Sequence, residues 1–201
     1  MLLLITCRKS NFMPLIILFG PTGAGKTYIG KLLEKEFGYY FYDGDTDLTT
    51  EMKQALNSMK VITDQMRQKF ISRLINSTDR LCHNHDKLVV AQTFIKERYR
   101  VKLLKKLPQA KFVLVKTKTD LRYQRRQTRA DYPWDEAYVK KMDSLFEALR
   151  IPYQTITNDS NGTNNLKADL RRLLSALSPR SCELNRGRGW WNISGRGLEI
   201  R

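Results

Sequence analysis

The sequence contains few of the residues that mark secreted or metal-binding proteins. It has three cysteines and two histidines among 201 residues. Cys7, Cys82 and Cys182 share no metal-ligand spacing and cannot all pair in disulfides, so we expect a reduced, cytoplasmic setting. His83 and His85 stand close together, but no third and fourth ligand occurs at a recognisable spacing. A polar loop is therefore favoured over a metal site.

Long apolar runs are also missing, which bears on membranes. No stretch approaches the roughly 20 apolar residues of a membrane-spanning helix, so we expect no membrane partner. The apolar start, residues 1–5, is shorter than the core of a secretion signal, and its charges follow rather than precede it. An apolar content of 41% is nevertheless enough for one globular domain with a full core.

Acidic residues are in the minority. The 20 Asp and Glu residues face 36 Lys and Arg residues, which gives a net charge of +16. A strongly basic domain attracts nucleic acid without sequence preference. The charge is, however, spread along the chain and does not form one stripe interleaved with aromatic residues. Nucleic-acid binding therefore remains an alternative, and the favoured explanation is a phosphate-handling enzyme with many cations.

What the sequence does contain is a complete phosphate-binding loop. The pattern G-x-x-x-x-G-K-[ST] is matched at every fixed position by Gly20, Pro21, Thr22, Gly23, Ala24, Gly25, Lys26 and Thr27. The apolar run 15–19 before the loop predicts a buried strand, and helical spacing over 28–37 after it predicts a helix. Backbone amides of such a loop surround the β-phosphate, Lys26 reaches the β- and γ-phosphates, and Thr27 holds Mg²⁺. The sequence therefore predicts a nucleoside triphosphate site, with ATP and Mg²⁺ as the expected cofactors.

The rest of the core alternates between strands and helices. Further strands are predicted at 39–42, 88–91, 111–115 and 153–157. Further helices are predicted at 49–59, 64–82, 94–107, 119–129, 133–149 and 164–177. This alternation implies a parallel sheet covered by helices on both faces, in an α/β fold of the P-loop NTPase type over residues 14–177. Residues 1–13 are expected to be an N-terminal appendage, and residues 178–201 a disordered Gly/Arg-rich tail.

A cluster of carboxylates follows the second predicted strand. Asp43 and Asp45 come where ligands bind in an open parallel sheet, outside the carboxyl ends of the strands and beside the P-loop. One such carboxylate can hold Mg²⁺ through water, and another can orient or deprotonate an attacking hydroxyl. We expect Asp45 to be catalytic and Asp43 to support both it and the metal, while Asp47 caps the next helix. The plainer alternative is a solvated acidic turn.

Several segments together resemble one branch of the P-loop kinases. The chain is similar to the gluconokinase branch of the shikimate-kinase-like kinases in residues 20–27, 41–45, 63–67, 88–100 and 142–149. The resemblance implies a kinase that uses ATP and Mg²⁺ to phosphorylate a hydroxyl of a small anionic metabolite. A gluconate-like sugar acid is the first candidate acceptor and shikimate the second. We expect a monomer or a homodimer.

The resemblance also implies a mobile lid that closes over ATP, here residues 121–134. Its arginines are Arg122, Arg125, Arg126 and Arg129. A lid arginine brings its charge to the γ-phosphate oxygens once both substrates are bound. Arg125 matches the family's lid arginine best and is expected in catalysis, and Arg125 and Arg126 are expected in nucleotide binding. The loop after the fifth strand, residues 157–162, lies where this kinase class commonly packs the adenine, and a polar loop without that role is the alternative.

The predicted acceptor pocket departs from the family pattern. Residues 46–50 replace the His-Pro and Asn that shape the sugar-acid pocket, and residues 92–96 keep only the final lysine of the family segment. Lys96, Arg67 and Arg100 remain candidates to hold a carboxylate or phosphate of the acceptor. Two alternatives therefore stay open. They are a nucleoside or polynucleotide 5′-hydroxyl kinase, and a nucleotide-dependent RNA-binding or regulatory protein on a kinase scaffold.

Overall fold

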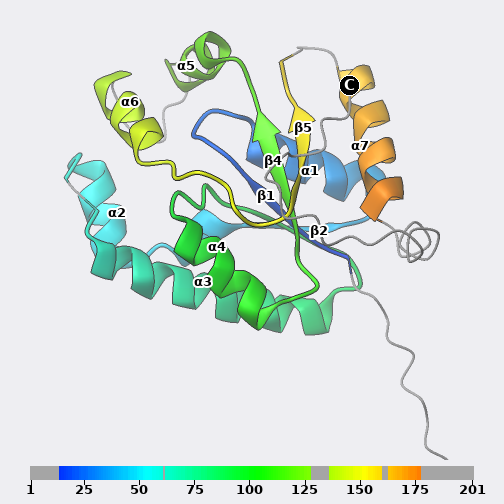
Figure 1. Ribbon diagram of the computed structural model, residues 1–201, viewed down its shortest axis with the longest axis horizontal. Coiled ribbons are helices and arrows are strands. Elements are labelled where there is room, and N and C mark those ends of the chain that lie inside the picture. Colours follow the sequence, from blue (N-terminus) through cyan, green and yellow to red (C-terminus); the bar gives the residue numbers. More distant parts are fainter. Residues whose placement is uncertain (1–13, 61, 128–135, 160–162, 178–201) are drawn as a thin grey trace, which may run out of the picture.

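The computed structural model describes residues 14–60, 62–127, 136–159 and 163–177. Its centre is a parallel sheet with helices on both faces (Figure 1). The five strands have the spatial order β2-β3-β1-β4-β5 and are β1 (Leu15–Phe19), β2 (Tyr40–Asp43), β3 (Leu88–Ala91), β4 (Lys111–Lys116) and β5 (Tyr153–Thr157). The predicted five-stranded parallel sheet is thereby confirmed. The predicted N-terminal appendage and C-terminal tail lie outside the described residues.

Helices lie in the crossover connections between the parallel strands. They are α1 (Lys26–Phe37), α2 (Thr50–Asn57), α3 (Asp64–Asn84), α4 (Glu97–Lys106), α5 (Thr119–Gln127), α6 (Glu136–Ser144) and α7 (Thr163–Leu177), with a short 3-10 helix η1 (Gly44–Asp47) after β2. Helices α1 and α7 cover one face of the sheet, and α3 and α4 cover the other (Figure 1). Among the described helices, none combines the length and apolarity needed to cross a membrane.

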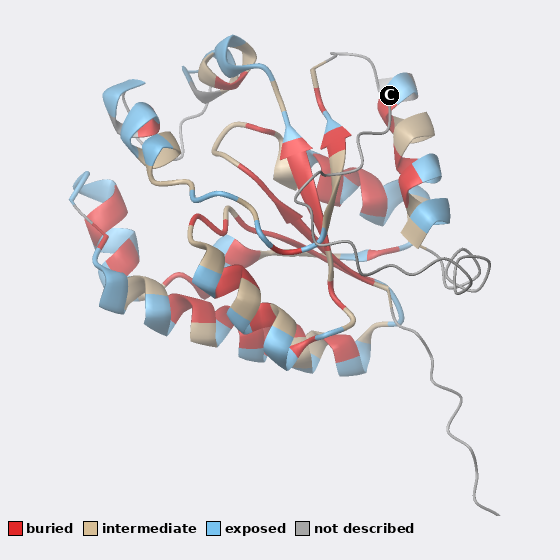
Figure 2. Cartoon of the chain, in the orientation of Figure 1, coloured by how far each residue is buried: buried red, intermediate tan, exposed pale blue. Residues whose placement is uncertain are grey.

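The two faces of the sheet form two separate apolar cores. In β1 the side chains of Leu15, Ile17 and Phe19 pack toward α3 and α4, whereas Ile16 and Leu18 pack toward α1 and α7. Successive side chains of a strand point to opposite faces, so an all-apolar strand is what a sheet covered on both sides requires. Figure 2 shows the central strands buried throughout and the outer surfaces of the helices exposed. The continuous apolar run of β1 thus places the P-loop directly after a fixed, fully buried strand.

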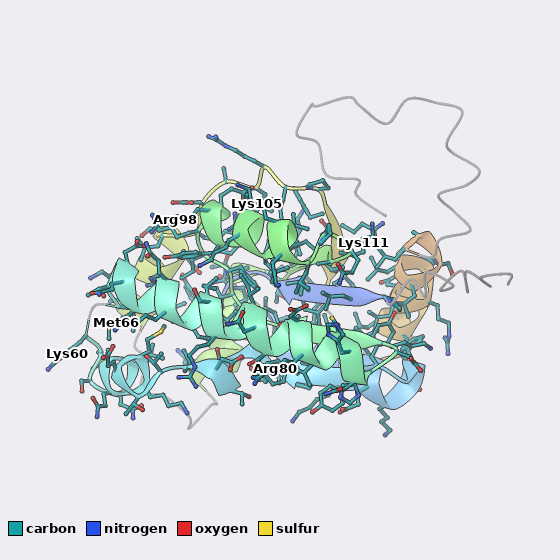
Figure 3. The ribbon with its side chains drawn as sticks, turned by 90° about the horizontal axis from the view of Figure 1, so that it is seen from below. Lys60, Met66, Arg80, Arg98, Lys105 and Lys111 are labelled. Carbon is teal, nitrogen blue, oxygen red and sulfur yellow. The ribbon has the colours of Figure 1, made fainter. Side chains whose placement is uncertain are left out.

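Helices α3 and α4 lie side by side beneath the sheet (Figure 3). Arg98 at the start of α4 forms an ion pair with Asp64 at the start of α3. The hydroxyl of Tyr99 donates a hydrogen bond of 2.8 Å to the same carboxylate. These contacts fix the start of α3, which also forms part of the site described below.

Two predicted helix ends and one predicted helix cap are corrected by the structure. The helix predicted from residue 94 begins at Glu97. The helix predicted to run to residue 149 ends at Ser144, because the following segment hydrogen-bonds to the loop before α4, where the amide of Glu147 donates to the carbonyl of Ile95 at 2.9 Å. The expected helix cap Asp47 is wrong, since Thr49 caps α2 by accepting from the amide of Met52 at 3.2 Å.

Candidate active site

The P-loop joins β1 to α1 at the carboxyl edge of the sheet. Gly20 has φ of 140°, and a Cβ there would lie 2.7 Å from the carbonyl oxygen of Val115. Gly23 has φ of 82°, and a Cβ there would lie 2.8 Å from the carbonyl oxygen of Arg122. Both the left-handed backbone and the close approach require glycine at these two positions. The loop can therefore curl tightly at the N-terminus of α1, where amides and the helix dipole favour an anion.

Lys26 and Thr27 are the first residues of α1, so both side chains start at the mouth of this loop. Lys26 Nζ donates hydrogen bonds to the carbonyl oxygens of Gly20 and Pro21, each at 3.0 Å. Thr27 Oγ1 donates to Asp43 Oδ2 at 3.3 Å. The ammonium group thus spans the loop that would surround phosphates, and the hydroxyl lies beside a carboxylate.

The oxygen ligands at this position suit Mg²⁺. A hydroxyl from Thr27 and a carboxylate from Asp43 are hard ligands of the type that Mg²⁺ prefers. Within the described parts of the chain, no group of three or more His, Cys, Asp or Glu residues could enclose a metal ion. A site with one or two protein ligands fits a Mg²⁺ ion that completes its shell with nucleotide phosphates and water.

Asp43 and Asp45 are oriented by the turn after β2. Asp43 Oδ1 accepts from the backbone amide of Asp45 at 3.1 Å and so caps η1. Asp45 Oδ1 accepts from Gln92 Nε2 at 2.9 Å. The turn can approach β3 this closely because residue 44 is glycine, where a Cβ would lie 2.9 Å from the carbonyl oxygen of Ala91. The predicted pair of carboxylates therefore lies beside the P-loop, as the parallel sheet requires.

A buried network holds this turn against α3. Asp47 Oδ2 accepts from the hydroxyl of Tyr42 at 2.9 Å, and its Oδ1 accepts from Ser77 Oγ at 3.0 Å. Arg80, which is labelled on α3 in Figure 3, donates to the same serine hydroxyl at 3.2 Å. Burial and the nearby Asp47 carboxylate raise the pKa of Tyr42 above its ordinary value, so the phenol stays a donor. Asp47 thus anchors the turn that carries Asp45, a role that its sequence neighbours did not indicate.

Helix α5 brings two arginines to the P-loop. Arg122 is buried, donates from Nε to the carbonyl oxygen of Thr22 at 3.1 Å, and forms an ion pair with Asp143 of α6. Arg125 lines the cavity, with Nη1 3.7 Å from the position of a Cβ at Gly25.

Of the lid predicted over 121–134, the structure describes only the part up to Gln127. The side chain of Arg126 and all of Arg129 lie outside the described parts.

Two residues after β4 and β5 hold the far side of the P-loop. Thr117 Oγ1 and Asn158 Nδ2 both donate to the carbonyl oxygen of Ala24, at 2.9 Å and 3.0 Å. Asn158 is 3% exposed and belongs to the loop that the resemblance assigns to adenine packing, yet its amide is directed at the P-loop backbone. Thr117 was not predicted, although its position directly after a buried strand was an available signal.

A cavity of about 700 Å³ connects the P-loop to α2 and α3. The P-loop side is lined by Thr22, Gly23, Gly25, Lys26, Thr27 and Arg125. Polar residues at the ends of β2 and β3 lie between the two sides, and they are Asp43, Asp45, Gln92 and Thr93. The side toward α2 and α3 is lined mainly by apolar residues, among them Leu48, Met52, Leu56, Phe70, Ile71 and Phe94. A cavity with a phosphate-binding side and a second side across two carboxylates can hold a nucleotide and an acceptor together.

The three predicted acceptor-binding cations are not brought together. Arg67 of α3 lines the cavity. Lys96 instead forms an ion pair of 3.0 Å with Glu147 and does not line the cavity. Hydrogen bonds from the backbone amide of Glu97 and from Lys96 lower the pKa of Glu147 below its ordinary value.

The prediction that Arg100 binds the acceptor is wrong, because its guanidinium is fully buried. It donates to the carbonyl oxygens of Phe94, Ile95, Glu147 and Ala148 and pairs with Glu97. Its charge also lies 4.8 Å from the ring centre of Phe146. Arg100 joins the loop before α4 to the segment after α6 and does not reach the cavity.

Comparison with known proteins places these features in a family. Residues 15–149 match the model of a family described as "AAA domain". A probable gluconokinase from Xenopus tropicalis is 32% identical over 92 residues, which are 45% of this chain and 47% of that relative. The match thus spans about half the length of the relative.

Solved structures show the same fold. A gluconokinase from Sinorhizobium meliloti 1021 superimposes with a TM-score of 0.69 at 21% identity, covering 89% of this chain and 99% of that one. A shikimate kinase from Acinetobacter baumannii in complex with shikimate superimposes with a TM-score of 0.57 at 21% identity, covering 81% and 94%. The predicted resemblance to gluconokinase-like and shikimate-kinase-like P-loop kinases is confirmed.

Proposed function

The chain belongs to the AAA domain family, and we propose that it is an ATP- and Mg²⁺-dependent kinase. It would transfer the γ-phosphoryl group to a hydroxyl of a small anionic metabolite. The observation that carries the proposal is one cavity lined by the P-loop residues Lys26 and Thr27 and by the carboxylates Asp43 and Asp45. The kinase names of the similar proteins support it.

The P-loop side of the cavity would hold the nucleotide. The Lys26 ammonium would leave the two carbonyl oxygens that it contacts and neutralise charge on the β- and γ-phosphates. Thr27 and Asp43 would hold Mg²⁺, which when bound neutralises charge on the same phosphates. Arg125, which lies over Gly25, would meet the charge that spreads over the γ-oxygens during transfer.

Asp45 would direct the acceptor hydroxyl. The hydroxyl oxygen forms a bond to the γ-phosphorus, while the bond from that phosphorus to the bridging oxygen of ADP breaks. The hydroxyl proton passes to the Asp45 carboxylate, whose orientation is fixed by Gln92. The reaction needs no covalent intermediate on the enzyme, because phosphoryl transfer depends mainly on positioning and charge stabilisation.

The acceptor would carry an anionic group that Arg67 holds, because Arg67 lines the cavity on the side away from the P-loop. The names of the similar proteins make a gluconate-like sugar acid the first acceptor to test and shikimate the second. A sugar-acid acceptor would place the enzyme in carbohydrate metabolism. We expect it to act in the cytoplasm as a monomer or homodimer.

Acceptor-dependent consumption of ATP tests this proposal. The panel is gluconate, shikimate, nucleosides and an oligonucleotide with a 5′-hydroxyl, each with Mg²⁺ and after its removal by EDTA. Lys26→Ala should abolish the consumption, whereas Lys35→Ala, an exposed lysine of the same helix, should not change it. If ATP binds but neither this panel nor the two apolar acids named in the next subsection raise its consumption, the kinase proposal fails and the RNA-binding alternative takes its place.

A further inference from the structure

The cavity wall beyond Asp45 is strongly apolar. Leu48, Met52, Phe70, Ile71 and Phe94 line it, and their exposed fractions lie between 2% and 7%. These residues come from the turn after β2, from α2, from α3 and from the segment after β3. Their clustering on one side of the cavity is therefore a property of the fold and cannot be read from any one segment.

Charge is scarce on this side. Among the described residues that line the cavity beyond Asp45, Arg67 carries the one formal charge. It belongs to the first turn of α3, whose start is fixed by the contacts of Asp64 with Arg98 and Tyr99. A single guanidinium on an apolar wall suits one carboxylate or a similar anionic group at one end of a ligand.

Polar groups on this side are largely engaged with the protein. The Gln92 side chain donates to Asp45 and accepts from the amide of Thr93 at 2.6 Å. The Tyr99 hydroxyl donates to Asp64. A ligand with many hydroxyls would bury them against apolar side chains, and each hydroxyl without a partner opposes binding. Gluconate carries a secondary hydroxyl on every carbon between its carboxylate and its primary hydroxyl, so it fits this wall poorly.

We infer that the acceptor is an acid with an apolar body, a hydroxyl at one end and a carboxylate or similar anionic group at the other. This inference rests on the proposed kinase function and narrows its acceptor class. The hydroxyl meets Asp45, the anionic group meets Arg67, and the body packs against Met52, Phe70 and Phe94. The hydroxyl of this acid receives the γ-phosphoryl group of ATP in the same transfer as described above.

A matched pair of acids tests the inference directly. 6-Hydroxyhexanoate has the chain length, carboxylate and terminal hydroxyl of gluconate but methylenes in place of the secondary hydroxyls. 4-(Hydroxymethyl)benzoate adds an aromatic body of similar length. Each acid is titrated by calorimetry into the full chain saturated with Mg²⁺ and a non-hydrolysable ATP analogue. We expect both to bind at least about tenfold more tightly than gluconate, which is a difference of about 1.4 kcal/mol.

Two variants connect the preference to the wall. Met52→Gln keeps the side-chain size but adds polar atoms, so the preference over gluconate should shrink. Arg67→Gln should weaken the binding of all three acids at least about tenfold, and Arg73→Gln, an exposed arginine of the same helix, should leave it unchanged. The Arg67 comparison stands even if the Met52 variant does not fold.

The outcomes separate this inference from the kinase proposal. Preferential binding of the apolar acids without phosphoryl transfer from ATP supports the apolar wall and Arg67 as a binding site for such acids and contradicts the kinase activity, and with it their role as acceptors. If gluconate is phosphorylated with a kcat/KM equal to or higher than that of the two apolar acids, the kinase activity is supported and the apolar acceptor class is overturned. Failure of both apolar acids to bind also overturns it.

Discussion

Gln92 Nε2 donates a hydrogen bond of 2.9 Å to Asp45 Oδ1, which ties the end of β3 to the turn after β2. Gln92 Oε1 in turn accepts from the backbone amide of Thr93 at 2.6 Å, so the orientation of the side-chain amide is fixed. The carboxylate that we propose for catalysis therefore has one oxygen held in a defined direction. Gln92 would act as a positioning residue for Asp45.

Gln92→Leu removes the donor while keeping a side chain of similar size. We expect kcat to fall about tenfold with little change in KM for ATP, because the nucleotide contacts are untouched. Gln92→Glu should raise the pKa of the acidic limb of the kcat profile, because a second carboxylate disfavours the charged form of Asp45. Gln65→Leu, at an exposed position on α3, is the control. An unchanged kcat in Gln92→Leu would contradict the positioning role.

Arg122 couples the P-loop to α6 through Thr22 and Asp143. Arg122→Ala leaves the partly buried carboxylate of Asp143 without this partner and removes a contact to the P-loop. We expect the free energy of unfolding to fall by about 2 kcal/mol and KM for ATP to rise several-fold. Denaturant unfolding and steady-state kinetics measure the two effects. The double variant with Asp143→Asn should lose less than the sum of the single variants, and simple additivity would refute the coupling.

Glu147 gives the fold a pH-dependent contribution. Its lowered pKa means that the folded state favours the ionised carboxylate. The resulting stabilisation is complete at a pH above the ordinary pKa of a glutamate carboxyl. It is lost as the pH falls through the lowered pKa of Glu147 in the folded state. Glu147→Gln should therefore be less stable than the parent at pH 7 by roughly 0.5–1 kcal/mol, and the difference should shrink toward zero near pH 2. Urea unfolding at both pH values measures this, with the exposed Asp86→Asn as control. A difference that grows on acidification would show that the sign is wrong.

Cys82 is 6% exposed, and burial together with the nearby Asp79 raises its pKa to about 11. The thiol is the unreactive form, so at pH 8 the side chain should be nearly inert. In a Cys7→Ser, Cys182→Ser chain, we expect the aromatic disulfide DTNB to react with Cys82 at least about a hundredfold more slowly in the native state than in urea. Equal rates would mean that the α3 helix is not packed as described.

The sheet and the position of the P-loop beside Asp43 and Asp45 could be predicted because their signals are local. The apolar run before the P-loop, the glycine spacing and the placement of Asp43 and Asp45 at a strand end all lie within short segments. The acceptor side could not be predicted in the same way. Leu48, Phe70 and Phe94 are far apart in the sequence and share a wall only after folding.

The predicted arginines show a second reason why part of the site could not be predicted from the sequence. Arg100 was expected in the acceptor site, but the segment after α6 leaves its helix at Ser144 and directs its carbonyl groups at this arginine. Arg122 was grouped with the lid arginines, but it contacts the P-loop backbone. The direction of a long side chain depends on which distant segment offers it a partner, and residue spacing does not record this.

Transfer of the γ-phosphate to an acceptor is the direct test of the proposed kinase activity. ATP labelled in the γ-phosphate is incubated with Mg²⁺ and the acceptor that binds best, and the label in the acceptor is compared with the ADP formed. We predict equal amounts of labelled acceptor and ADP with the parent chain, and a rate at least about a hundredfold lower in Asp45→Asn with ATP affinity changed little. Label that never reaches an acceptor would contradict the kinase activity, and an Asp45→Asn variant as fast as the parent would contradict the catalytic role of Asp45.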